Sequence, residues 1–259
     1  MSNLGERFRP STAVNTWIGT AASPNYGPDS VAGLAAWYDA SSATYVTTSS
    51  GQAESVTDRS GSGFTLTGTY PNAPNWNART QNGLPVLSFY DDSGAKRLQN
   101  DHFTLAQPCT IFMAASIDVT TNGGIGFRTM TGWTNNYNGS GQGCQFPITS
   151  GKLQLFAGGS FVGDTQLTAG AAFQATAVFN GSASHLDVNG AAGSPVNPGT
   201  DGWTDGPLQI GDVWAALNGG SYAAPFDGWI GELIYYSGAL SAGDRATIET
   251  YLRAKWGTP

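Results

Sequence analysis

The sequence predicts an all-β sandwich that ends in one short helix. It has 259 residues, of which 36 are glycine and 13 are proline, and only 11% are charged. An average globular chain carries about a quarter charged residues. Short segments alternate apolar and polar positions and are separated by turn residues, as strands do. Many short strands without helices between them favour a sandwich or jelly roll with a single core over alternating β-α units.

The first thirty residues differ in character from the rest. They contain Pro10, Pro24 and Pro28, hold few large apolar residues and show no hydrophobic period. Such a segment is typical of an extended arm or linker. We therefore divide the chain into an arm, residues 1–30, and one domain, residues 31–259. Because the arm cannot bury an apolar face of its own, we expect it to anchor the protein to another subunit.

From Val31 onward the alternation predicts eight main strands. The clearest places Cys109 on the same face as Ile111 and Met113, so we expect a buried thiol at Cys109. A disulfide between Cys109 and Cys144 is the less favoured alternative, since two cysteines do not make a disulfide scaffold. The predicted strands lie within 33–41, 83–90, 109–119, 152–158, 173–179, 184–190, 208–212 and 228–238.

The last segment, 241–256, has the pattern of an amphipathic helix. Ser241 is a good N-cap residue and Asp244 places a carboxylate in the first turn. Ile248, Leu252 and Trp256 then share one helical face. We expect this helix to dock on the sandwich.

Five segments carry a family resemblance: GLAAWYDASSAT at 33–44, DRSGSGFTLT at 58–67, NGLPVLSF at 82–89, VFNGSASHLDVNG at 178–190, and the ending from FDGWIGELIYYSG to YLRAKWG at 226–257. Their wording and order resemble the laminin-G-like branch of the concanavalin-A-like lectin and glucanase superfamily. The resemblance covers residues 31–257 and leaves the arm unmatched. It implies a concanavalin-A-like jelly roll, and domains with this closing helix are, by resemblance, frequent in bacteriophage structural proteins and bacterial surface proteins.

Motifs for catalysis are missing from the sequence. The strand motifs E-x-D-x-x-E and E-x-D-x-E, which hydrolases of this superfamily carry, are absent. The sequence also contains no G-x-S-x-G elbow, phosphate-binding loop or metal-ligand histidine spacing. Glu232 is the one tempting acid, and its place in the strand G-x-I-x-E favours a structural carboxylate. These absences predict a protein that is not an enzyme; a glycoside hydrolase or lyase is the less favoured alternative.

Two glycine-rich loops, 132–143 and 211–222, have the chemistry of sugar binding. Aromatic faces stack on sugar rings, while amides and carboxylates bind hydroxyl groups. The alternative is that these aromatic residues pin the loops to the sandwich or contact a neighbouring subunit. The candidate sugar-binding residues are Trp133, Asn135, Asn136, Tyr137, Asp212, Trp214, Asn218 and Tyr222.

Calcium is a possible cofactor, because folds of this kind bind it through loop oxygens. The candidate ligands are Asp91, Asp92, Asp101 and Asp212. The alternative is that these acids serve the backbone of turns.

Charge limits the range of partners. The net charge is −7, the pI is about 4.6, and lysine occurs only at Lys96, Lys152 and Lys255. We therefore expect neither a nucleic-acid partner nor membrane insertion. The first residues show no apolar stretch typical of a secretory signal.

We expect a virion structural or decoration protein, a head- or tail-attached spike or fibre component that binds a host-surface glycan. Its partners would be other virion subunits, reached through the arm, and copies of itself in a homo-oligomer. The alternative is a stand-alone carbohydrate-binding module at the cell surface or outside the cell.

Overall fold

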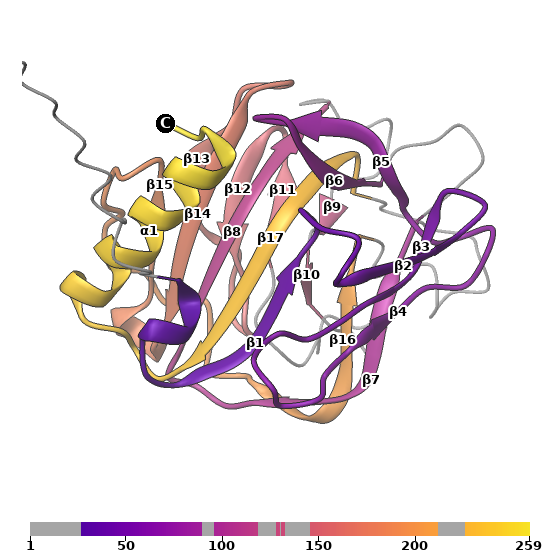
Figure 1. The fold of residues 1–259 in the computed structure, drawn as a ribbon. Helices are drawn as coiled ribbons and strands as arrows, with labels where there is room; N and C mark the ends of the chain where they lie inside the picture. The colour runs from indigo at the N-terminus through magenta and orange to yellow at the C-terminus, as the bar shows by residue number, and fades with distance from the viewer. Residues whose placement is uncertain (1–26, 90–95, 119–127, 130, 133–145, 212–225) are drawn as a thin grey trace, which may run out of the picture.

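The computed structural model describes residues 27–89, 96–118, 128–129, 131–132, 146–211 and 226–259. Two layers of strands pack face to face, and helix α1 (Ala242–Trp256) lies on the outside of one layer (Figure 1). The predicted all-β sandwich with a C-terminal helix is confirmed. Within the described ranges, no helix is long and apolar enough to cross a membrane.

The first layer is built around two long antiparallel strands, β8 (Cys109–Ile117) and β17 (Gly228–Ser237). Two strands pair with the edge of β17 that faces away from β8. Strand β1 pairs with the C-terminal part of this edge and β6 with its N-terminal part. The remaining strands of this layer are β1 (Leu34–Asp39), β5 (Asn75–Gln81), β6 (Leu84–Ser88), β14 (Ala172–Phe179) and β15 (His185–Val188).

The second layer faces the first across the core. Its strands run in the order β2, β3, β4, β7, β16 and β10. A separate four-stranded sheet, β9-β11-β12-β13, contributes Ile148, Leu153 and Leu155 to the same core. One pair, Gln52 with Asn75, joins the layers through β3 and β5. The bounds are β2 (Val46–Ser49), β3 (Gln52–Val56), β4 (Leu66–Thr67), β7 (Leu98–Leu105), β9 (Arg128–Thr129), β10 (Thr131–Gly132), β11 (Pro147–Thr149), β12 (Lys152–Leu155), β13 (Val162–Gln166) and β16 (Trp203–Ile210), with short 3-10 turns at Pro28–Ser30 and Gly181–Ala183.

Both faces of strand β8 are apolar because each face packs into a core. Cys109, Ile111 and Met113 point into the core between the layers, and none of them is exposed to solvent. Phe112 and Ala114 point the other way, into a second core beneath the helix. The predicted burial of Cys109 is confirmed. Cys144 lies outside the described residues.

Helix α1 closes this second core. Ser241 Oγ accepts a hydrogen bond from the backbone N–H of Asp244 at 3.2 Å, which caps the first turn. Gly257 adopts a φ of 64° and ends the helix in the left-handed conformation. Ile248, Leu252 and Trp256 are fully buried against the first layer. The predicted helix, its cap and its docking face are confirmed.

The turn at 58–67 is organised by a single carboxylate. Asp58 accepts hydrogen bonds from the backbone N–H of Trp37 at 3.0 Å, of Ser60 at 2.9 Å and of Phe64 at 3.1 Å. The Oγ of Ser60 donates to Asp58 as well. This acid therefore fastens the turn to β1, which explains why the D-x-S-G segment has its acid first.

Candidate functional site

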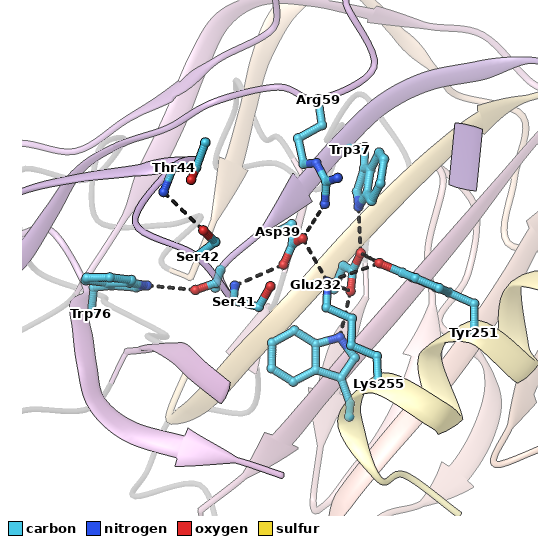
Figure 2. A network of polar contacts seen from close by, with 12 residues as sticks. Trp37, Asp39, Ser41, Ser42, Thr44, Arg59, Trp76, Glu232, Tyr251 and Lys255 are labelled. Carbon is cyan, nitrogen blue, oxygen red and sulfur yellow. Dashed lines mark hydrogen bonds and ion pairs between the residues drawn. The ribbon is translucent and has the colours of Figure 1, made fainter. Parts of the chain in front are cut away.

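A cluster of buried charged residues lies where α1 meets the first layer (Figure 2). Asp39 on β1 and Glu232 on β17 are direct partners in the antiparallel register. Lys255, from the last turn of α1, binds both: its Nζ lies 2.8 Å from Asp39 Oδ2 and 2.9 Å from Glu232 Oε2. We call these three residues, with the side chains that bind them, the seam network.

Glu232 is enclosed by hydrogen-bond donors. Its Oε1 accepts from Trp37 Nε1 at 2.6 Å and from the Tyr251 hydroxyl at 2.8 Å, and its Oε2 accepts from Trp256 Nε1 at 2.7 Å. With Lys255, four donors from one strand and one helix converge on a carboxylate that is 0% exposed. These bonds offset the desolvation of the buried charge.

Asp39 is held from three directions. Besides Lys255, the guanidinium of Arg59 binds its Oδ2, and the backbone N–H of Ser41 donates to its Oδ1 at 2.9 Å. The Cζ of Arg59 also lies 3.5 Å from the centroid of the Trp37 ring and 4.2 Å from that of Tyr45. Arg59 thus connects the turn after Asp58 to the seam network through both charge and aromatic contact.

Their surroundings shift the pKa values of the two carboxyl groups, Glu232 and Asp39, in opposite directions. Burial raises the pKa of Glu232 above its usual range, against the opposing charge of Lys255. Burial also acts to raise the pKa of Asp39, but the charge of Lys255 and hydrogen bonds from Lys255 and Ser41 outweigh it, so this pKa is lowered. Burial and the neighbouring Glu232 raise the pKa of the Tyr251 hydroxyl, which stays a neutral donor.

Separated carboxyl pKa values are a feature of acid-base catalysis. A catalytic carboxyl must nevertheless touch its substrate, and here Glu232 is 0% and Asp39 2% exposed, with helix α1 packed over them. The geometry therefore assigns the seam network to holding the helix against the sheet, as the sequence predicts for Glu232.

A backbone irregularity changes one detail of that prediction. The sequence pattern places Ile230, Glu232 and Ile234 on one face of the strand. The register shifts between Ile230 and Glu232, so Ile230 faces the core between the layers while Glu232 and Ile234 face the helix. Gly231 lies at this shift, beneath the ring of Trp256.

None of the predicted sugar-binding residues can be placed. Trp133, Asn135, Asn136 and Tyr137 fall within 133–145, and Asp212, Trp214, Asn218 and Tyr222 fall within 212–225; both ranges lie outside the described residues.

The described residues that bracket these two loops do lie together. Gly132, the first residue of the first loop, pairs with Gln209 of β16. Gly211, the first residue of the second loop, accepts a hydrogen bond at 2.8 Å from the backbone N–H of Phe226, which follows that loop. Both loops therefore start from neighbouring strands, β10 and β16, at positions only a few residues apart in the register.

The calcium prediction is also left open. Asp91, Asp92 and Asp212 lie outside the described residues, and Asp101 is an exposed residue on β7 that accepts a hydrogen bond from Gln99. Among the residues that the structure describes, no group of three or more histidine, cysteine or acidic side chains is placed to hold a metal ion.

Most of the seam network could not be predicted from the sequence. No sequence motif indicates a role for Arg59 or Lys255, and the helical pattern predicts Trp256 only as an apolar anchor. One signal was present: Tyr251, Lys255 and Trp256 carry polar tips on one side of the helix, at spacings of one and four residues.

Comparison with known proteins gives structural neighbours only. No protein-family model matches the sequence, and neither does any curated protein. A sialidase from Trypanosoma rangeli matches with a TM-score of 0.54 at 13% identity, covering 88% of this chain and 34% of that one. An arabinofuranosidase, solved in complex with arabinofuranosyl-alpha-1,2-xylobiose, matches with a TM-score of 0.57 at 13% identity, covering 79% and 51%.

A third neighbour is a single domain. Domain 4 of AbnA, a GH43 extracellular arabinanase from Geobacillus stearothermophilus in complex with arabinotriose, matches with a TM-score of 0.56 at 15% identity. The match covers 84% of this chain and 97% of that domain. The chain thus spans about a third of the sialidase and about half of the arabinofuranosidase, but nearly all of Domain 4.

The prediction that the protein is not an enzyme is contradicted by these neighbours, which are glycoside hydrolases or parts of them. Its basis was the absence of known catalytic motifs from the sequence, and the identities to these neighbours are only 13 to 15%. The likeness shows the fold alone and identifies no catalytic residue in this chain.

Proposed function

We propose that the chain is a carbohydrate-binding β-sandwich domain. The observation that carries this proposal is the match to Domain 4 of AbnA, which extends over nearly the whole of a domain solved with arabinotriose. A second observation supports it: the two loops with sugar-binding chemistry start from neighbouring strands, β10 and β16, only a few residues apart in the register.

The test is direct titration of the purified chain with arabinotriose, preceded by a screen on a glycan array. Trp133→Ala and Trp214→Ala should each weaken binding roughly tenfold or more, as truncation of an aromatic anchor does. Phe161→Ala is the matched control, because Phe161 is an exposed aromatic residue beside β13 that belongs to neither loop and stacks on Phe156. Absence of binding to every glycan tested would refute the proposal.

We further propose that this domain is displayed on a virion of bacteriophage type, as the laminin-G-like resemblance implies, with the N-terminal arm as anchor to another subunit. The described chain shows where such an arm would reach the domain. The Tyr236 hydroxyl donates to the carbonyl of Pro28 at 2.7 Å, and Val31 packs in the core beneath the helix. The arm therefore joins the domain on the α1 side, opposite the outward face of the second layer.

Removal of residues 1–26 tests the anchor, since it leaves Pro28 and its hydrogen bond in place. The truncated chain should keep its β-rich circular dichroism spectrum and its glycan binding, but lose incorporation into particles and homo-oligomers. A truncated chain that still assembles would contradict the anchor and favour the stand-alone module at the cell surface.

A further inference from the structure

A row of uncharged polar side chains crosses the second layer at right angles to its strands. Each member is the direct register partner of the next, from β2 through β3, β4 and β7 to β16. At its far end the row reaches Gly132, where the first aromatic loop begins. The members of this polar row are Thr47, Ser55, Thr67, Gln99 and Gln209.

The row points away from the core. The residue next to each member along its strand is buried between the layers, and successive side chains of a strand point to opposite faces. These buried neighbours are Val46, Val56, Leu66, Leu98 and Ile210. The row therefore lies on the outward face of the second layer, on the side of the molecule opposite helix α1.

The chemistry of the row matches that of sugar hydroxyl groups. Hydroxyl and carboxamide side chains both donate and accept hydrogen bonds. Thr47 and Ser55 already share one at 2.6 Å, and Thr67 Oγ1 donates to the backbone of Gln99 at 3.3 Å. In Gln209, which is only 5% exposed, Oε1 has no hydrogen-bond partner in the part of the chain that the structure describes. An unpaired buried acceptor is rare and costly, and a bound hydroxyl would satisfy it.

The charge around the row selects for a neutral ligand. None of its five members carries a positive charge that could bind an anionic sugar. Two acids flank the row, the exposed Glu54 before Ser55 on β3 and Asp101, which accepts from Gln99 at 3.0 Å, while one base, Arg97, lies two residues before Gln99. These carboxylates repel an anionic sugar. The row therefore does not suit a sialic acid, although one structural neighbour is a sialidase.

We propose that the polar row is the floor of an extended subsite for a neutral oligosaccharide that lies across the strands. Strands of one sheet lie about 4.8 Å apart, so the row spans roughly 19 Å over four intervals. This spacing is close to the length of one monosaccharide unit, which places about one unit on each strand. The inference rests on the proposed function. It adds the class of ligand, the direction in which the ligand crosses the sheet and the residues on which it lies.

The experiment is calorimetric titration of the full chain with linear arabino-oligosaccharides, from the disaccharide to the heptasaccharide, and with sialyllactose. Affinity should rise with chain length up to about the pentasaccharide and then level off, since the row crosses five strands. Sialyllactose should not bind. Gln99→Ala and Thr67→Ala should each weaken pentasaccharide binding about fivefold, the value of one hydrogen bond, and leave disaccharide binding less affected.

Thr250→Ala is the matched control, because Thr250 is an exposed residue of α1 whose hydroxyl binds its own helix. It should leave both the affinity and the thermal midpoint unchanged. If the chain binds oligosaccharides but the row variants bind as the wild type does, or affinity levels off at the disaccharide, the polar row is refuted and the loops alone remain. If no glycan binds at all, the proposed function itself fails.

Discussion

The indole Nε1 of Trp256, in the last turn of α1, donates a hydrogen bond of 2.7 Å to Glu232 Oε2 at the centre of β17. Both residues are completely buried. The bond gives the helix one position on the sheet, because an apolar ring alone could slide over its neighbours while a buried indole N–H must meet its acceptor. Two of the other three donors to this carboxylate, Tyr251 and Lys255, also come from the helix.

Replacing Glu232 by glutamine tests this account of helix docking. Glutamine can still accept from Trp37 and Tyr251, but its amide N–H₂ then faces Trp256 and Lys255, which are themselves donors. We expect Glu232→Gln to lower the free energy of unfolding by about 3 kcal/mol, as breaking a buried ion pair does. Urea denaturation measures this. Glu54→Gln on the exposed face of β3 is the control and should change stability by less than about 0.5 kcal/mol. A Glu232→Gln protein as stable as the wild type would contradict this role of Glu232 in docking the helix.

Gly231→Ala should separate the helix from the sheet by steric contact alone. A Cβ at Gly231 would lie 2.7 Å from Cζ3 of the Trp256 ring, closer than packed carbon atoms come. We expect a loss of about 1–3 kcal/mol, which is typical of overpacking, together with a changed tryptophan fluorescence. Gly243→Ala is the matched control: it lies in the first turn of α1 with space around it, and alanine there should be neutral or stabilising by up to about 1 kcal/mol. Unchanged fluorescence and stability in Gly231→Ala would show that the ring moves aside freely.

Much of the fold could be predicted because its strands obey local rules. β8 and β17 contain continuous apolar runs and α1 has a cap, a periodic face and a terminating glycine, so both kinds of element were found. Strands β5 and β7 were missed, because NWNARTQ and LQNDHFTL contain few apolar residues. Their positions are set by pairing with β6 and β16, and such long-range pairing leaves no local pattern.

The candidate site was harder to predict for the same reason. Asp39 and Arg59 come from the N-terminal part of the domain, whereas Glu232 and Lys255 come from its C-terminal part. Their charges neutralise one another only after the sheet and helix have assembled. The bulge at Gly231 also shifts the face of Glu232 relative to Ile230, which a strict alternation of side chains cannot foresee.

Asp58→Ala should loosen the turn that joins the arginine of the seam network to β1. It removes the acceptor of three backbone N–H groups, including that of the buried Trp37. We expect the free energy of unfolding to fall by about 3 kcal/mol, since hydrogen bonds to a charged acceptor are among the stronger ones. Asp58→Asn should lose less, because the amide oxygen still accepts. Thermal unfolding of both variants, with Asp101→Ala as an exposed control, measures the order of their stabilities. If Asp58→Ala were more stable than Asp58→Asn, the role of the carboxylate as an acceptor would be contradicted.

The seam network should make stability depend on pH in two opposite ways. The pKa of Asp39 is lowered in the folded protein, so between that value and the ordinary Asp value of about 3.9 the unfolded chain binds more protons. Its contribution to stability is therefore complete above about pH 4 and is lost on further acidification. The pKa of Glu232 is raised, so above the ordinary Glu value of about 4.3 the folded state keeps a proton that the unfolded chain has lost. Its contribution therefore decreases as the pH rises through the folded pKa.

Difference curves separate these two effects. The free energy of unfolding of the wild type minus that of Glu232→Gln, followed from about pH 3 to about pH 7, should be largest at and below about pH 4 and decrease toward neutrality, because only the wild type carries the carboxyl with the raised pKa. The difference between the wild type and Asp39→Asn should instead grow as the pH rises to about 4. Glu54→Gln, at an exposed position, should give a flat difference. If the Glu232→Gln difference instead grew from pH 4 to pH 7, the pKa of Glu232 would be lowered in the folded protein. That result would contradict the conclusion that burial outweighs the charge of Lys255 at this carboxyl.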